Sequence, residues 1–434
     1  MFQKICACAG AVLAGLFSAL PAALAQGSPP PGYFDIPSGF DFPGDKTVLE
    51  KLALSGDLAA QRKHAWSVFA GITQLTPDGK NPVFETWFSE AETFQSPAAL
   101  IDKAPRRGGA LRFSVPAQMR SFRGQSLTDA SAGSAILSEV MFNFANYDHI
   151  RHEKLYLTAT LDELAKTGAP DPKIPGSKTV SPFPTNAVSL KTIWWPIFPD
   201  KVTPMPIWDP DGNPQIKTGN SYQTWKRVVA VDPQRLNIPN NEETTVTFLG
   251  QARPHAHVVS LKDAFHYVVV DTPMAATANT NIRLQGFVKA VLGRPLQVGD
   301  YVAFIGTHLT TKEIDNWIWA TYWWHDRPSD GPYAAGRPAS LQGVWRNYLM
   351  NTSYDVNLPH EPDGSPHVAF NPWLEAHFID GVLSNCMNCH NRASTTAPDF
   401  RPIMRGDPDL KSDPAYKAGA VRADFLWSVL FNAH

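Results

Sequence analysis

From about residue 170 onward, short runs rich in β-branched and aromatic residues alternate with clusters of Pro, Asn, Asp and Gly. Runs of this length, separated by turn-forming residues, predict β-strands. We expect strands at residues 187–198, 223–231, 244–249, 266–270, 282–292, 301–309 and 317–324. So many strands in one stretch of chain predict a large β-rich body, built like a sandwich or a barrel.

The last of these runs indicates its own place in the sheet. Alternation along a strand gives each face a separate set of side chains. Both sets are apolar here: Trp317, Trp319 and Trp323 on one face, and Ile318, Ala320 and Tyr322 on the other. The run is therefore expected to be a central strand that is covered on both sides.

Helical patterns flank the β-rich part of the chain. Residues 134–147 and 161–166 carry apolar side chains at helical spacing before it. Beyond residue 340, Asn371-Pro372 is a cap and first-turn pair for a helix that leads toward residue 386, and Asp413-Pro414 opens a second candidate helix with an apolar stripe at residues 426–430. The predicted class is α+β, with a β-rich body at residues 26–340 and a helical segment at 341–434.

Residues 1–25 have the pattern of a secretory signal peptide. Lys4 precedes an apolar run that ends in small residues at Ala25, where cleavage is expected. The alternative is a membrane anchor that stays attached. Pro21 interrupts the run and no cationic flank follows it, so cleavage and export to the periplasm are the better interpretation.

Cleavage changes the charge and the cysteine content. The 38 basic and 40 acidic residues become 37 and 40 when Lys4 is lost, so there is no basic surplus for nucleic acid or an anionic membrane. No later segment has the roughly 18 consecutive apolar residues of a membrane span. Of the four cysteines, Cys6 and Cys8 are removed, which leaves Cys386 and Cys389.

These two cysteines belong to the segment Cys386-Met387-Asn388-Cys389-His390, a C-x-x-C-H motif. Two thiols three positions apart can reach the two vinyl-derived carbons of one porphyrin edge, and the next imidazole can turn onto the iron. A thioredoxin-type redox centre and half of a zinc site are the alternatives. Neither a βαβ context nor a second cysteine pair accompanies the motif, so covalent haem attachment is the prediction.

The motif resembles that of the c-type cytochromes, and this resemblance implies one covalent haem c with His390 as the proximal iron ligand. The 44 residues after His390 are few for the usual small cytochrome domain, so the haem is expected to dock against the β-rich body. Residues 301–325 and 424–427 are also similar to a set of uncharacterised proteobacterial exported cytochrome-c-like proteins. That similarity implies no activity.

The sixth iron ligand is left open by the sequence. Met404 is the only methionine after the motif, and a thioether on the iron would raise the potential and favour electron transfer. Alternatively, Met404 fills the core. His377 and His434 are weaker candidates. If none of the three binds, the iron is open to a small ligand.

Several histidines lie in the β-rich region, and they permit a second metal. His255 and His257 are two positions apart and would face the same way on a strand, with His266, His308 and His325 on later strands. Pro254 favours a turn at this point, so a second metal is not the preferred interpretation. One of these histidines could instead be the distal ligand or a donor in the distal pocket.

The aromatic run at residues 317–324 is best explained as packed core. Its alternative is a wall of an apolar cleft or of the haem site, with Arg327 pairing a haem propionate. Signatures of nucleophilic hydrolases, phosphate loops and dinucleotide folds are absent from the sequence.

Three functions follow from these predictions. The first is an exported monohaem cytochrome that exchanges electrons with a redox partner protein. The second is a haem-dependent periplasmic oxidoreductase with an open distal site for a small-molecule substrate. The third is a module that binds a ligand or a partner and carries an accessory haem.

Overall fold

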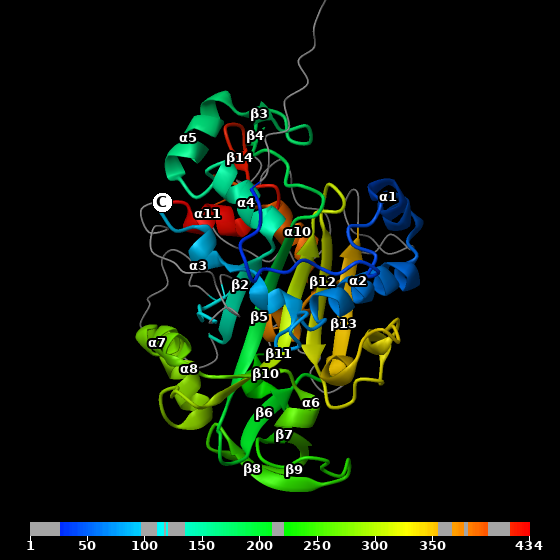
Figure 1. Cartoon of the computed structure of the whole chain (residues 1–434), viewed down its shortest axis with the longest axis vertical. Coiled ribbons are helices and arrows are strands. Elements are labelled where there is room, and N and C mark those ends of the chain that lie inside the picture. Colours follow the sequence, from blue (N-terminus) through cyan, green and yellow to red (C-terminus); the bar gives the residue numbers. More distant parts are fainter. Residues whose placement is uncertain are drawn as a thin grey trace, which may run out of the picture.

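The computed structural model describes residues 27–96, 111–116, 119, 135–210, 221–354, 367–376, 381–397 and 417–434. Its centre is an antiparallel seven-stranded sheet in the order β1-β2-β5-β11-β12-β13 (Figure 1). The seventh strand, β10, pairs with the N-terminal end of β11, and β12 pairs with the C-terminal part of β11. The strands are β1 (Phe88–Ser89), β2 (Leu137–Phe142), β5 (Val188–Ile197), β10 (Tyr267–Val269), β11 (Tyr301–Thr311), β12 (Ile318–Trp324) and β13 (Tyr348–Tyr354). The predicted α+β class is confirmed.

Two smaller sheets extend the molecule at its ends (Figure 1). One has the order β6-β7-β9-β8, with β6 (Thr203–Ile207), β7 (Arg227–Asp232), β8 (Glu243–Phe248) and β9 (Gln251–Ser260). The other consists of β3 (Ala169–Pro170), β4 (Lys178–Thr179) and β14 (Val421–Arg422). In the second of these, β14 pairs with β4, so the C-terminal part of the chain is joined to a segment more than 200 residues earlier.

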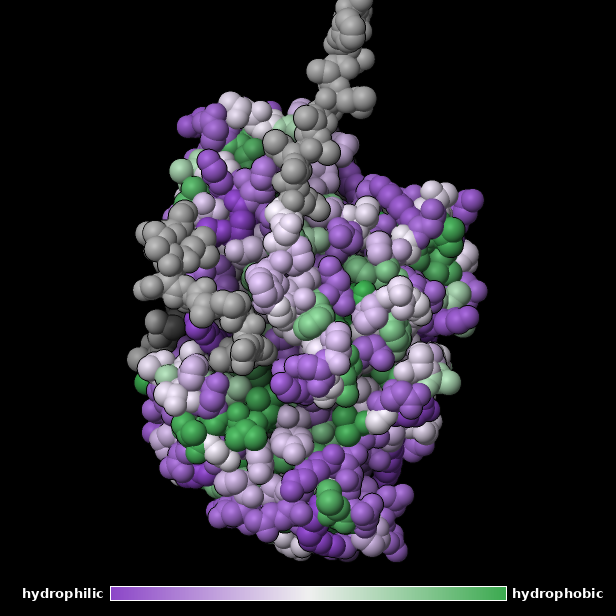
Figure 2. All heavy atoms as spheres, viewed as in Figure 1, coloured by the Kyte–Doolittle hydropathy of each residue, from purple (hydrophilic) through white to green (hydrophobic). Residues whose placement is uncertain are grey.

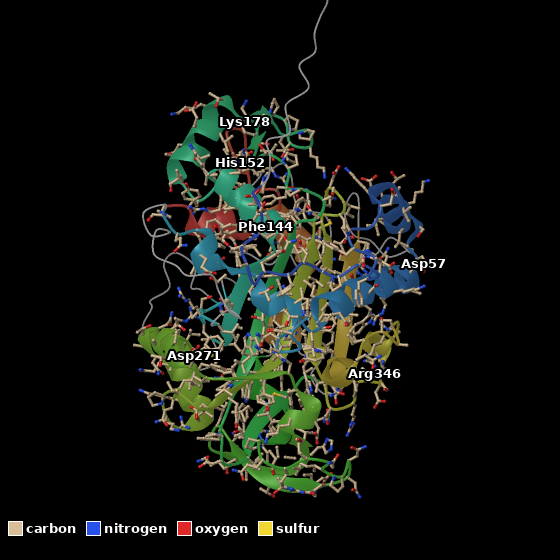
Figure 3. All side chains as sticks on the ribbon, in the orientation of Figure 1. Asp57, Phe144, His152, Lys178, Asp271 and Arg346 are labelled. Carbon is tan, nitrogen blue, oxygen red and sulfur yellow. The ribbon has the colours of Figure 1, made fainter. Side chains whose placement is uncertain are left out.

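Helices cover the edges and faces of the sheets. They are α1 (Lys46–Ser55), α2 (Leu58–Ile72), α3 (Glu90–Thr93), α4 (Phe144–His152), α5 (Thr158–Thr167), α6 (Leu261–Ala264), α7 (Thr272–Thr280), α8 (Ile282–Leu292), α9 (Pro372–Glu375), α10 (Cys386–Asn391) and α11 (Trp427–Asn432). Asp57 and Asp271, labelled in Figure 3, accept hydrogen bonds from the first turns of α2 and α7. Such caps satisfy backbone donors that the helix itself cannot pair.

The strand β12 lies inside the large sheet and is covered on both faces, as its sequence predicted. On one face, Tyr322 stacks on Phe69 of α2 with ring centroids 4.0 Å apart, and its hydroxyl donates to the carbonyl oxygen of Ala65. On the other face, the ring of Trp319 lies 4.4 Å from the ring of His390 on α10. The C-terminal segment and α2 therefore pack on opposite faces of one sheet.

Two segments differ from the sequence-based prediction. Residues 282–292 form the helix α8 and not a strand: Asn281 caps its N-terminus, Gly293 ends it at φ 69°, and its buried side chains recur at helical spacing. Residues 134–147 were predicted as one helix. The structure instead places the strand β2 here, paired with β5. A separate helix, α4, then begins after Asn143, whose side chain caps it.

The C-terminal region is also less helical than predicted. The helix α9 has four residues, and α10 begins at Cys386 itself. Asp413 and Pro414 lie outside the described residues, and the apolar stripe near the end belongs to α11. The strand β13 falls within residues 341–434 and pairs with β12, so the C-terminal region contributes a strand to the body.

No helix among the described residues is long and apolar enough to cross a membrane. The segment 1–25 lies outside the described residues. Figure 2 shows apolar patches among a mostly polar surface, including one at the right-hand edge, where α1 exposes Val48 and Leu54. Small groups of exposed apolar side chains are ordinary, because much of a folded protein's surface is apolar.

Candidate functional site

The helix α10 carries both cysteines of the C-x-x-C-H motif. Cys386 and Cys389 are three positions apart on one helical turn, so their side chains share a face of the helix. Both cysteines are thiols that are not joined in a disulfide, and both are buried. Burial raises the pKa of Cys386 well above its usual value, and the negative charge of Glu375 raises it further. The thiol of Cys386 is thus held in its protonated form in an apolar environment, next to Cys389.

Asn385 fixes the start of this helix. Its side-chain oxygen accepts hydrogen bonds from the backbone nitrogens of Met387 at 2.9 Å and Asn388 at 3.4 Å. Its side-chain nitrogen donates to the hydroxyl of Ser353 on β13 and to the carbonyl oxygen of His367, each at 3.1 Å. One side chain therefore caps α10 and ties it to the last strand of the large sheet.

His390 follows the second cysteine, and its Nδ1 atom lies 2.8 Å from the backbone carbonyl oxygen of Phe425. A carbonyl can only accept, so Nδ1 is the protonated nitrogen and Nε2 carries the lone pair. Burial lowers the pKa of His390 to about 3, with smaller contributions from the positive charges of Lys191 and His308. The imidazole is consequently neutral, which is the form that binds metals.

The turn that presents this carbonyl has a strained backbone. Asp424 and Phe425 have φ angles of 44° and 68°, in the left-handed region that non-glycine residues rarely occupy. The Asp424 carboxylate accepts hydrogen bonds from the Lys312 ammonium at 2.6 Å and from the backbone nitrogen of Phe183 at 3.1 Å. These bonds to two other parts of the chain hold the turn against its strain.

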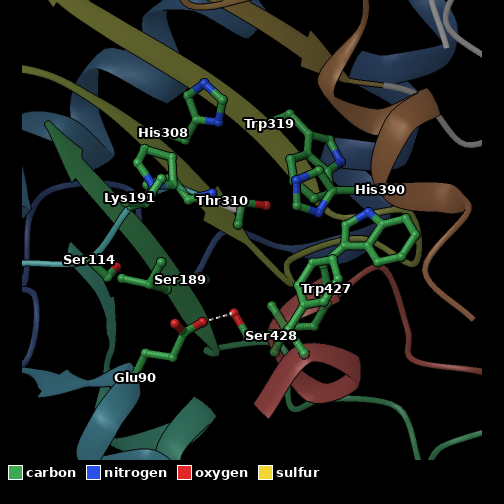
Figure 4. A pocket seen from close by; sticks show the side chains of 15 residues that line it. Glu90, Ser114, Ser189, Lys191, His308, Thr310, Trp319, His390, Trp427 and Ser428 are labelled. Atoms are coloured by element: carbon green, nitrogen blue, oxygen red, sulfur yellow. Dashed lines mark hydrogen bonds between the residues drawn. The ribbon is translucent and has the colours of Figure 1, made fainter. Parts of the chain in front are cut away.

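A pocket opens beside His390, between α10, α11 and the large sheet (Figure 4). The space, including its mouth, is about 670 Å³. Its lining is Glu90, Ser114, Val115, Pro116, Val140, Ser189, Lys191, His308, Thr310, Trp319, His390, Leu426, Trp427, Ser428 and Phe431. The indole nitrogen of Trp427 donates to the carbonyl oxygen of Cys389 at 3.2 Å, so α11 closes over the helix that carries the cysteines.

The floor of the pocket is one face of the large sheet. Lys191 on β5 is directly opposite His308 on β11, and Ser189 is directly opposite Thr310. Residues directly opposite each other on paired strands project to the same side. These four side chains therefore form a polar patch, which we call the polar quartet, in an otherwise buried sheet.

His308 is held next to a buried carboxylate. Its Nε2 atom lies 3.3 Å from Oε2 of Glu375 on α9, without the alignment of a hydrogen bond. The same carboxylate oxygen accepts the backbone N–H of Asn371 at 2.7 Å. Burial raises the pKa of Glu375, but His308 and the Asn371 amide outweigh it, and the net pKa lies below its usual value. Glu375 is thus a charged partner for the imidazole of His308.

The other histidines of the β-rich region do not line this pocket. His255 is exposed and pairs with Glu243 at 2.8 Å, and the Nε2 atom of His266 lies 2.6 Å from Glu85. His257 and His325 both lie 3.5 Å from the Asp326 carboxylate. Among the described residues, no group of three or more His, Cys, Asp or Glu side chains could hold a metal ion.

The remaining candidates stand apart from the pocket or outside the described residues. Arg327 is exposed and follows the C-terminal end of β12, whereas Trp319 lies near the start of that strand. Arg327 therefore does not line the pocket. His434 packs against Tyr156 with ring centroids 6.3 Å apart. Met404 and His377 lie outside the described residues.

Sequence reasoning identified Cys386, Cys389 and His390 but missed Lys191 and Glu375, and it gave His308 no preference over other histidines. A signal was present in the strands: Ser189 and Lys191, like His308 and Thr310, are polar residues at alternate positions of apolar runs. Polar residues at alternate positions of a buried strand all point to one face, so they indicate that this face lines a polar site. Comparisons with protein-family models, curated proteins and solved structures found no match to this chain.

Proposed function

We propose that the protein is an exported monohaem c-type cytochrome that transfers electrons through a haem bound covalently to Cys386 and Cys389. The observation that supports this most strongly is the pairing of two buried thiols, not joined in a disulfide, on one helical turn with an imidazole whose Nδ1 donates to a carbonyl. That bond directs Nε2 of His390 to act as the proximal ligand. The haem, when bound, supplies reversible one-electron chemistry at its iron.

The donor set fits this cofactor. Each thiol would form a thioether bond with one vinyl group, and apolar side chains such as Trp319, Leu426 and Trp427 would contact the ring. The burial of the site would exclude water and tune the potential of the iron. Met404 remains the proposed sixth ligand, and export through residues 1–25 remains the proposed route to the periplasm.

A second candidate is a haem-dependent periplasmic oxidoreductase with an open distal site. The observation that favours it is the pocket itself, because His390 shares it with the polar quartet. An electron carrier needs an apolar surround for its haem and has no need of such polar groups. If Met404 does not bind the iron, the oxidoreductase is better supported than the electron carrier.

The test of the proposal is covalent haem retention. The full chain would be produced in a bacterial host that matures c-type cytochromes, and then denatured and separated from free haem. The expected result is one haem per polypeptide in the wild type and none in the variant Cys386→Ser with Cys389→Ser. The control is Met387→Leu, which changes the motif between the thiols but keeps both of them. Loss of all haem from the denatured wild type would overturn the proposal.

A further inference from the structure

The imidazole of His390 has a neighbour against its ring as well as one at its Nδ1 atom. The ring of Trp319 on β12 lies 4.4 Å from the imidazole, centroid to centroid, with an angle of 40° between the two planes. Figure 4 shows the two side chains side by side in the wall of the pocket. Trp319 also contacts Phe425, whose carbonyl oxygen accepts the Nδ1–H, with ring centroids 6.3 Å apart. One indole therefore contacts both residues that form this hydrogen bond.

The hydrogen bond alone leaves the imidazole free to tilt. A single N–H···O bond fixes the position of Nδ1, but the ring can still turn about that bond, because a carbonyl oxygen accepts over a broad range of directions. A second ring packed against the imidazole blocks this turn, since protein interiors are close-packed and leave no room for it. The two contacts together fix the plane of His390 and the direction in which Nε2 points.

Trp319 is itself held in place, as a residue that positions another must be. Its indole nitrogen donates to the carbonyl oxygen of Asn316 at 2.9 Å, and its own carbonyl oxygen accepts the hydroxyl of Thr352 on β13 at 2.8 Å. It is 3% exposed and lies inside the large sheet, with β11 paired on one side and β13 on the other. Asn385 joins the start of α10 to the same strand β13. The indole is thus a rigid surface, fixed in the sheet, against which α10 sets the imidazole.

We propose that Trp319 is a positioning residue that fixes the plane of the His390 imidazole for the haem iron. The inference rests on the proposed covalent haem and deepens it, since it gives the proximal ligand a second determinant besides the bond to Phe425. Groups that orient a ligating histidine typically change metal affinity about 10- to 100-fold when they are removed. Trp319 acts through His390 and does not bind the iron itself.

The test is proton NMR of the oxidised, haem-loaded protein with cyanide bound. Cyanide occupies the sixth position of the iron in every variant, and the shifts of the haem methyl protons then report the plane of the proximal imidazole. Trp319→Phe keeps a ring beside His390 and should keep the wild-type pattern of shifts. Trp319→Leu removes the ring and should change that pattern or split it into several sets. Trp319→Met takes its place if the Leu variant does not fold, because Met fills irregular gaps.

Trp323→Leu is the matched control. Trp323 is buried on the same face of the same strand, about 13 Å further along at roughly 3.3 Å per residue, and it does not line the pocket. Its loss should lower stability and leave the methyl shifts unchanged. A wild-type pattern in Trp319→Leu would overturn the proposal, and so would an equal change in Trp323→Leu, which would mean a general loss of packing. A changed pattern in Trp319→Phe would assign the effect to the bond with Asn316 and would also overturn it.

A second measurement separates this proposal from the proposed function. Absence of covalent haem would overturn the proposed function, and the role of Trp319 would then be decided in the full chain without haem. The nitrogen NMR shifts of His390 distinguish the two tautomers of its imidazole. The Nδ1–H tautomer alone is expected in the wild type and in Trp319→Phe, with both tautomers in Trp319→Leu. Both tautomers in the wild type, or one in Trp319→Leu, would overturn the positioning role.

Discussion

The Nδ1 atom of His390 lies 2.8 Å from the carbonyl oxygen of Phe425, a residue 35 positions further along the chain. The orientation of the proposed proximal ligand therefore depends on a turn near the C-terminus and not on α10 alone. This turn has two residues in the left-handed region. Its anchors should accordingly control both stability and, in the proposed haem protein, the state of the iron.

Asp424→Ala tests this dependence. The change removes the carboxylate that pairs with the buried ammonium of Lys312 and leaves it only the carbonyl oxygen of Asp315. It also removes an Asp from a left-handed position that Ala tolerates less well. The free energy of unfolding is expected to fall by about 3 kcal/mol in denaturant titrations of the haem-loaded protein. Asp424→Asn keeps an acceptor for the N–H of Phe183 and should cost less. Equal costs for the two variants would contradict the role given to the turn.

Asn385→Ala should uncouple α10 from β13. The variant loses the helix cap and two donated hydrogen bonds, so a loss of about 2 kcal/mol in stability is expected. The haem content per polypeptide should fall as well, because the thiols lose their fixed position. Asn281→Ala removes the cap of α8, which is remote from the motif, and should lower stability without changing haem content. The same haem loss in both variants would refute a specific role.

The sixth ligand can be assigned by absorption spectroscopy. If Met404 binds the iron, the oxidised wild type is low spin with a sulfur-to-iron charge-transfer band, and Met404→Ala loses that band. Met205→Leu, a buried change on β6, is the control and should keep it. An unchanged spectrum in Met404→Ala would exclude methionine ligation and favour the open-site oxidoreductase.

His64 predicts a pH dependence of stability in the body. Burial lowers the pKa of His64, but the ion pair with Glu313 outweighs it, so the net pKa is raised above 6.5. A group whose pKa is raised by folding stabilises the fold fully below its unfolded pKa and loses that contribution as pH rises through the folded value. Urea unfolding should show stability falling above about pH 6.5.

His64→Gln is the variant that isolates this effect. It removes the titrating group and should flatten the pH dependence, while Glu313→Gln should do the same by removing the charge that raises the pKa. Persistence of the full slope in both variants would show that other groups cause it.

The sequence predicted what depends on local patterns. The strands around Trp195, Phe304 and Trp323 follow from β-branched and aromatic runs, and the C-x-x-C-H motif is self-contained. The apolar residues of α8 are dense enough to fit the period of a strand as well as that of a helix, which is why a strand is predicted there. Asn281 and Gly293 are the signals that favour the helix.

The parts of the site that the sequence did not predict depend on contacts between residues far apart in the chain. The contact of His390 is with a backbone carbonyl, which every residue carries, so no side chain reveals Phe425 as its partner. The juxtaposition of Lys191 with His308 depends on strand register across more than 100 residues. Glu375 becomes a partner of His308 only when α9 packs on the sheet.

The burial of the two thiols has a consequence for biogenesis. Cys386 and Cys389 expose 8% and 7% of their surface in the folded chain, beneath α11 and the turn at Phe425. A ligation enzyme needs access to both sulfurs, so haem joining would precede closure of the C-terminal segment. If the proposed export and haem attachment take place, translocation, ligation and final folding would follow in that order. A chain that closed too early would be an inactive by-product of assembly.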